Sequence, residues 1–201
     1  MVFIKQAKSD SALVAPNSAA EILRALDATD SVTRSQAARA AAAYPECRPM
    51  LLAHLETETE PAVRANLLTT LIKMQSVEVA ENLIAYLRSE DVSLRNNVFT
   101  ALQQMPQAIA PHIPGLLRDP DMDVRIFALS IVRGMRSPEV EDWLLDVVAH
   151  ESNMNVCATA LDTLAEIGTP DMIPAIQSLN LRFNNEFIRF AVDVAIRRIS
   201  A

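Results

Sequence analysis

One short motif recurs six times along the chain, and its spacing constrains the fold more than any other feature. Each copy begins with an acidic or amide residue and ends four positions later in arginine, or in cysteine in the fifth copy. The copies span Asp30–Arg34, Glu60–Arg64, Asp91–Arg95, Asp121–Arg125, Asn153–Cys157 and Asn185–Arg189. Their last residues, which we call the arginine column, lie 30, 31, 30, 32 and 32 residues apart. Self-similarity at a fixed period of this size indicates stacked supersecondary units.

Each motif has the chemistry of a helix start. Side chains of Asp and Asn accept hydrogen bonds from the free amides of a first helical turn, so five copies begin with a good N-cap residue, whereas Glu60 is a weaker one. Apolar residues follow three, seven and ten positions after the arginine column, as in Leu67, Leu71 and Met74. This spacing places them on one buried stripe of a helix. A second apolar-periodic segment lies between motifs, so each unit is predicted to be an antiparallel pair of helices, A and then B.

The helix pairs predict an all-α fold. Neither helix of a pair can bury its stripe alone, whereas six stacked pairs bury one continuous core, which is an α-solenoid. We expect the repeat domain to cover residues 18–201, with residues 1–17 as an N-terminal tail or capping segment. The expected repeats span 18–44, 45–75, 76–105, 106–136, 137–168 and 169–201. Half of the residues are hydrophobic and 4% are aromatic, as is typical of alanine- and leucine-rich helical stacks.

Charge and composition exclude several classes of function. The formal net charge is -7, whereas tracking a nucleic-acid backbone relies on clustered Lys and Arg, so no nucleic-acid partner is expected. The sequence has no apolar run long enough to span a membrane and no secretory h-region at its start, so we expect a cytoplasmic monomer without membrane contact. The histidines fall in different repeats and different helical phases, so no metal site and no cofactor are expected.

The arginine column is predicted to be structural. Asp91, Arg95, Asp121 and Arg125 are expected to belong to a ladder of hydrogen bonds that keeps successive repeats in register. An anion-binding column is the alternative. At the break in the column, Cys157 is expected to be a small buried substitute, and thiol chemistry is the alternative there.

The motif D-x-x-V-R, the period near 31 and the segments 111–117 and 170–176 together resemble HEAT-like repeats of the phycobilisome-lyase type. The resemblance implies a right-handed superhelix whose B helices line the concave side. It does not specify a function, because such repeats occur in bilin lyase subunits, bilin-removing factors, hydroxylases and many adaptors.

The candidate binding face consists of positions one, two, five and nine after the arginine column, which helical phase places away from the core stripe. The candidates are Asn66, Asn97, Thr100, Gln104, Ile126, Phe127, Ser130, Thr159 and Asp162. Amides and hydroxyls with one apolar step at Ile126 and Phe127 suit an extended peptide or a protein loop. The alternative is a solvated polar face with Phe127 folded against its own A helix. Phe187 and Phe190 are further aromatic candidates for recognition.

The sequence thus predicts a small, bacterial-type, non-catalytic scaffold or adaptor that binds a protein or peptide through its concave face. The alternative is an enzyme subunit of the phycobilisome-lyase type that acts on a bilin-carrying protein.

Overall fold

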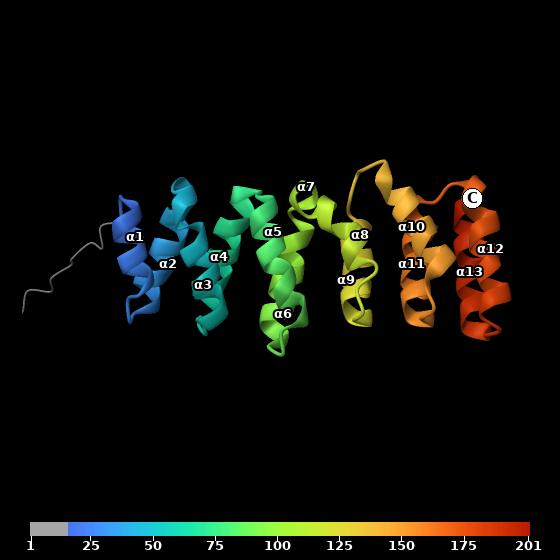
Figure 1. Ribbon diagram of the computed structural model, residues 1–201, viewed down its shortest axis with the longest axis horizontal. Coiled ribbons are helices and arrows are strands. Elements are labelled where there is room, and N and C mark those ends of the chain that lie inside the picture. Colours follow the sequence, from blue (N-terminus) through green and yellow to red (C-terminus); the bar gives the residue numbers. More distant parts are fainter. Residues whose placement is uncertain (1–15) are drawn as a thin grey trace, which may run out of the picture. The chain divides into compact units, whose positions relative to one another are not determined.

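The computed structural model describes residues 16–201, and within that range the regular elements are helices without strands (Figure 1). The predicted all-α class is therefore confirmed. The expected tail, residues 1–17, lies almost entirely outside the described residues. The chain divides into two compact units, residues 1–74 and 75–201, and each is described by itself.

The first unit contains two helix pairs. In the first pair α1 packs on α2, and in the second α3 packs on α4; α2 also packs on α4. Short 3-10 turns end the first pair and begin the second. The elements are α1 (Ala19–Leu26), α2 (Ser31–Ala40), η1 (Ala41–Ala43), η2 (Pro45–Cys47), α3 (Arg48–Thr57) and α4 (Pro61–Met74).

The second unit continues with four helix pairs, which we number 3 to 6. Its A segments are α5 (Val77–Ile84) with η3 (Ala85–Arg88), then α7 (Pro106–Ile109), η4 (Ala110–His112) and α8 (Ile113–Leu116), then α10 (Glu139–His150), and last η5 (Pro170–Met172) with α12 (Ile173–Arg182). Its B helices are α6 (Val92–Gln103), α9 (Met122–Val132), α11 (Met154–Ile167) and α13 (Glu186–Ile199). Each B helix packs on the next, so the pairs stack in chain order as an α-solenoid (Figure 1).

The B helices start where the motif predicts. The side chain of the first motif residue accepts a hydrogen bond from a backbone amide of the first turn in five copies, so these five predicted caps are confirmed. The residues are Asp30, Asp91, Asp121, Asn153 and Asn185, at 2.8 to 3.0 Å from their nearest amide nitrogens. Before α4, the amides of Thr59 and Glu60 instead donate to the carboxylate of Glu58, at 3.0 and 2.9 Å.

The predicted core stripe is confirmed at its first two positions, whereas the residue ten positions after the column is buried only as Met105 and Met135 and is half-buried in the other four copies. The residue three positions after the arginine column is fully buried in all six copies, from Ala37 to Val192. The residue seven positions after it is fully buried in the first five copies, whereas Ile196 in α13 is half-buried. The stripe therefore positions every B helix with one face in the core and the opposite face toward solvent.

Candidate functional site

The arginine column anchors the turn between the two helices of its own pair. Each of four guanidinium groups donates to the backbone carbonyl six residues earlier, where the A segment turns into the B helix. The bonds run from Arg34 to Ala28, Arg64 to Glu58, Arg95 to Ser89 and Arg125 to Asp119, at 2.9, 2.7, 2.6 and 2.7 Å. These contacts fasten the turn to the first turn of the B helix, and they give the column a structural role.

Two members of the column also reach the following helix pair. Arg125 binds Glu151 through Nε at 2.8 Å and Nη2 at 3.3 Å, and Arg34 binds Glu58 in the same two-pronged way at 2.8 and 3.0 Å. Each glutamate lies two residues before the first motif residue of the next B helix. Asp121, which the sequence places in the ladder with Arg125, accepts from the amide of Asp123 instead. The carboxylate that pairs with Arg125 therefore belongs to the next turn rather than to the cap.

Cys157 is a buried substitute within this scheme. Its side chain is fully buried, and Sγ lies 3.6 Å from the carbonyl of Glu151, again the sixth residue back. Arg182 from α12 lies 3.8 Å from Sγ and donates to the carbonyls of Val148 and Ala149 at 2.6 and 2.5 Å. Burial raises the pKa of the Cys157 thiol, and Arg182 offsets this only in part. A sequestered thiol with a raised pKa is a poor nucleophile, so the geometry favours packing over thiol chemistry.

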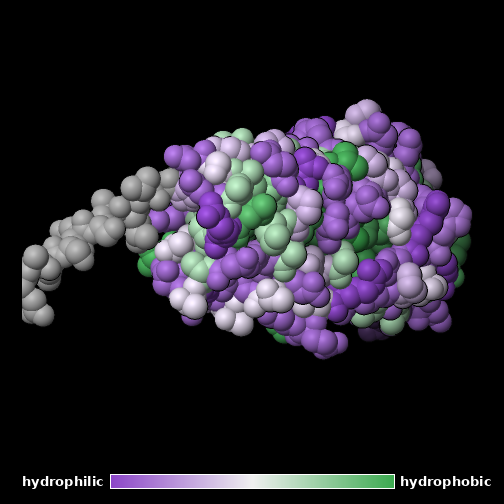
Figure 2. Space-filling view, turned by 60° about the vertical axis from the view of Figure 1, so that its left-hand side comes forward, coloured by the Kyte–Doolittle hydropathy of each residue, from purple (hydrophilic) through white to green (hydrophobic). Residues whose placement is uncertain are grey.

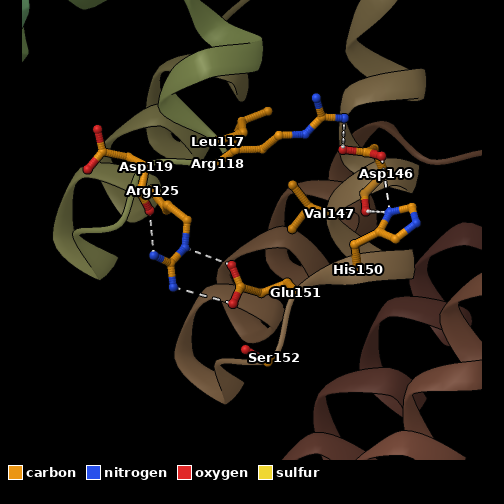
Figure 3. Close-up of a pocket in the computed structure, with 9 residues that line it drawn as sticks. All are labelled: Leu117, Arg118, Asp119, Arg125, Asp146, Val147, His150, Glu151 and Ser152. Atoms are coloured by element: carbon orange, nitrogen blue, oxygen red, sulfur yellow. Dashed lines mark hydrogen bonds and ion pairs between the residues drawn. The ribbon is translucent and has the colours of Figure 1, made fainter.

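A polar pocket of about 330 Å³ lies between pairs 4 and 5 (Figure 3). Two arginines and a histidine line it, and each contacts a carboxylate. Arg125 pairs with Glu151. Asp146 contacts both Arg118, at 3.0 Å, and His150, at 3.1 Å. Because the guanidinium groups are already neutralised by carboxylates, the pocket does not present them to an anion. Within residues 16–201 there is no group of three or more His, Cys, Asp or Glu side chains placed to hold a metal ion.

The candidate binding face occupies the solvent side of α6, α9 and α11. Asn97, Thr100, Gln104 and Asp162 are exposed on it, whereas Ile126, Phe127, Ser130 and Thr159 are half-buried. Asn66 lies on α4 of the first unit, which is described by itself. The ring of Phe127 lies 5.1 Å from that of Phe99 on α6, tilted by 40°. Phe127 therefore packs against the preceding B helix and keeps part of its ring accessible.

The polar groups of this face are largely engaged within their own helices. Side chains of Thr100, Ser130 and Thr159 donate to the carbonyl four residues earlier at 2.9 to 3.0 Å, and Gln104 does so at 3.3 Å. A hydroxyl bonded in this way retains an oxygen that accepts a hydrogen bond but has used its proton. The apolar side chains of the face are therefore the groups most available for contact with a partner.

An apolar pocket of about 150 Å³ extends the face between α11 and α13. It is lined by Ala158, Leu161, Asp162, Ala165, Phe187, Phe190, Ala191, Val194 and Ala195. Phe190 stands one position after the arginine column, as Ile126 does on α9, so both belong to the same face. The sequence marks the two phenylalanines as aromatic candidates but does not reveal the pocket. Alanines on both helices, at positions 158 and 165 on α11 and 191 and 195 on α13, leave room between the larger side chains of the lining.

These aromatic rings belong to a small set of exposed large apolar side chains within residues 16–201, together with Val32, Val77, Val92, Met154 and Leu181. Phe187 is 55% exposed and Phe190 is 65% exposed. In Figure 2 hydrophobic residues appear in small groups separated by hydrophilic ones. Large exposed apolar side chains beside a pocket mark interaction sites more often than scattered ones do.

None of the helices within residues 16–201 is long and apolar enough to cross a lipid bilayer.

Comparisons with known proteins agree with the helical repeats. The family model for HEAT repeats matches residues 109–196. No curated protein sequence matches the chain. Among solved structures, a HEAT-like repeats protein from the archaeon Thermococcus onnurineus NA1 is 17% identical, with 90% of this chain and 87% of that chain covered and a TM-score of 0.46.

Two further solved structures match with similar sequence identity, coverage and TM-score. The complex of CpcE and CpcF of phycocyanin lyase from Nostoc sp. PCC7120 is 16% identical, covering 98% of this chain and 100% of that chain, with a TM-score of 0.40. A designed armadillo repeat protein in complex with a (KR)4 peptide is 14% identical, covering 89% and 98%, with a TM-score of 0.44. The expected resemblance to HEAT-like repeats is confirmed by the family match over residues 109–196.

Proposed function

We propose that this protein is a non-catalytic scaffold that binds a segment of another protein on the B-helix face of its second unit. The observation that carries the proposal is the apolar pocket between α11 and α13, with the exposed rings of Phe187 and Phe190 at its edge. Ile126 and Phe127 supply a second apolar step on the same face.

The size of the pocket suits one side chain. A dry cavity of about 150 Å³ lined by apolar residues holds a benzene-sized group, and this pocket has about that volume. One aromatic or branched aliphatic side chain of a partner fits it. Aromatic anchors that lose their contact with water carry much of the affinity in protein interfaces.

Polar side chains around the apolar steps complete the arrangement. Asn97 and Thr100 on α6, Gln104 at the C-cap of α6, and Asp162 on α11 are exposed. Such groups form a rim that excludes water from a central anchor. Asp162 lines the pocket itself, so a partner with a hydrogen-bond donor or a basic side chain next to its apolar anchor is favoured.

Site-specific photo-crosslinking tests the location of the interface. A photoreactive amino acid replaces Asp162 on the B-helix face in one chain, and Gln177, an exposed residue of α12, in a matched control. After irradiation in cells, position 162 is expected to give a discrete crosslinked protein, and adding Phe190→Ser is expected to abolish it.

The control separates a specific face from general stickiness. Equal crosslinking from positions 162 and 177, or crosslinking at 162 that Phe190→Ser leaves unchanged, contradicts the proposal. The Phe190→Ser chain should unfold at the temperature of the parent chain, because this ring is mostly exposed.

A further inference from the structure

Two adjoining cavities lie between the A segment of pair 4 and α10, the A helix of pair 5. One is the polar pocket of about 330 Å³ (Figure 3). The other has a volume of about 220 Å³ and shares Leu117, Arg118 and Asp146 with the first. We call the smaller one the A-side cavity. Its lining consists of Pro114, Leu117, Arg118, Asp142, Trp143 and Asp146.

The interrupted A segment of pair 4 leaves room for this cavity. Pro111 and Pro114 divide the segment into η4 and α8 instead of one continuous helix. In contrast, α10 is an unbroken helix of 12 residues that packs mainly on α11 and α12. On the side that lines the cavity, α10 keeps Trp143 half-buried and Asp142 exposed. Both side chains are therefore accessible to a ligand.

The charged groups of the A-side cavity do not balance. Arg118 pairs with Asp146 at 3.0 Å, and His150 of the adjoining pocket contacts the same carboxylate. Asp142 is exposed, and within residues 16–201 its side chain forms no ion pair or hydrogen bond. In addition, α10 carries four carboxylates and no Lys or Arg. The cavity thus has an uncompensated negative charge at Asp142.

The uncharged part of the lining is apolar and comes from Leu117, Trp143 and Pro114. A purely apolar ligand would take the Asp142 carboxylate out of water without a partner, which is unfavourable. An anion would meet two carboxylates and one arginine. A basic side chain avoids both costs, because its apolar stem covers the apolar lining while its charged head pairs with the carboxylate.

Trp143 favours arginine over lysine as this basic side chain. Among aromatic side chains, tryptophan attracts cations most strongly. A guanidinium group is planar, so it stacks on an aromatic ring and also forms two parallel hydrogen bonds with a carboxylate, whereas an ammonium group does neither.

We propose that the A-side cavity binds an arginine side chain on a basic segment of a partner protein. The guanidinium group stacks on Trp143 and pairs with Asp142. This site goes beyond the scaffold function proposed above, because it lies on the A segments and not on the B-helix face.

The charge around the cavity favours a protein segment over free arginine. Glu139 and Glu141 are exposed in the first turn of α10, beside Asp142. These carboxylates attract further basic residues of a segment. They repel the carboxylate of the free amino acid, which a residue within a protein chain does not have.

The single tryptophan of the chain makes a direct test possible. In the isotope-labelled full chain, the indole N–H signal of Trp143 in the nuclear magnetic resonance spectrum reports on the cavity. A short acetylated and amidated peptide with one central arginine among glycines and serines is expected to shift this signal saturably. Replacing that arginine by citrulline, which keeps the shape and removes the charge, should weaken binding at least about fivefold. A lysine peptide should also bind more weakly than the arginine peptide.

Variants of the chain locate the binding site. Asp142→Asn should weaken binding of the arginine peptide about fivefold, because the only unpaired carboxylate of the lining is lost. Glu81→Gln removes the same charge from an exposed position on α5 and should have no effect. Asp142 also lies in the first turn of α10, where a carboxylate suits the positive end of the helix. Thermal unfolding of each variant therefore accompanies the titrations and shows that the chain is folded.

Arg118→Gln should have the opposite effect. It frees the Asp146 carboxylate for the peptide, so binding should become about threefold tighter. Arg136→Gln removes the same charge at an exposed position outside the lining and should leave the affinity unchanged.

Three results would overturn the proposal. They are absence of a saturable shift of the indole signal, equal affinity for the arginine and citrulline peptides, and equal weakening by Asp142→Asn and Glu81→Gln. Phe190→Ser, which tests the B-helix face, should not affect the peptide, so failure of one proposal is distinguishable from failure of the other.

Discussion

Replacing Glu151 by glutamine removes one charge from the contact that joins pairs 4 and 5. The Glu151 carboxylate accepts two hydrogen bonds from Arg125, at 2.8 and 3.3 Å, and one from the amide of Asn153 at 2.7 Å. Glutamine keeps the size of the side chain and one acceptor oxygen. Arg125 would retain its bonds to the carbonyls of Asp119 and Pro120 but would lose its counter-charge.

The burial of the pair sets the magnitude. The Arg125 and Glu151 side chains are 14% and 8% exposed. Exposed ion pairs contribute less than about 1 kcal/mol, whereas removing one partner of a fully buried pair costs about 3–5 kcal/mol. A mostly buried pair with an open pocket beside it lies between these limits, so Glu151→Gln should lower the free energy of unfolding by about 2 kcal/mol.

Asp146→Asn is the matched control, because it removes a carboxylate from the same pocket. Its partner Arg118 is 71% exposed, so the cost should stay below about 1 kcal/mol. Urea unfolding followed by fluorescence of Trp143, the one tryptophan of the chain, reports on α10 directly. Equal costs for the two variants, or a cost below about 0.5 kcal/mol for Glu151→Gln, would refute the assignment of Glu151 as a structural link.

Three further predictions concern individual residues. Hydrogen bonds from Arg34 hold the pKa of Glu58 below its ordinary value of 4.5. The ionised carboxylate therefore stabilises the fold above that pH, and this stability is lost as the pH falls through the lowered pKa. Acid unfolding curves should show a smaller loss of stability below pH 5 in Glu58→Gln than in the parent chain. Cys157 is fully buried, so a thiol reagent should modify it only at the rate of unfolding, and modification at the rate of an exposed thiol would contradict this. Phe127→Ala should lower the free energy of unfolding by about 1–2 kcal/mol, less than the ~3–5 kcal/mol of a core phenylalanine, because the ring is half-buried; thermal denaturation measures the difference.

The helix starts and the core stripe were predictable from the sequence because both depend on residues of one repeat. Asp91 and Leu94 are three residues apart, and their cap forms within a single turn. Ala37 and Val192 each lie three residues after the arginine column, and helical phase alone predicts that a residue at this spacing is buried.

Contacts between repeats were harder to predict. The motif contains both Asp121 and Arg125, which suggests a partnership, yet Arg125 pairs with Glu151 from a turn 26 residues later. Nothing in the period shows which carboxylate of the next turn comes within reach, because that depends on how two pairs pack. The pocket at Phe190 has the same origin, since it requires Ala158 and Ala165 on the neighbouring helix.

The A segment of pair 4 also departs from a single helix. The sequence predicts an apolar-periodic helix through Ile109 and Ile113, and the structure instead has α7, η4 and α8 in succession. Pro111 and Pro114 lack the backbone donors that a continuous helix needs at those positions. Both isoleucines are nevertheless fully buried, so the stripe is kept although the helix is interrupted.

One measurement tests the binding function of the B-helix face most directly. It compares the affinity of the partner crosslinked at position 162 for the purified parent chain with its affinity for the Phe190→Ser chain. Isothermal titration with that partner should show at least about tenfold weaker binding to Phe190→Ser, with an unchanged melting temperature. Equal affinity for the two chains would contradict the assignment of this face as the binding site.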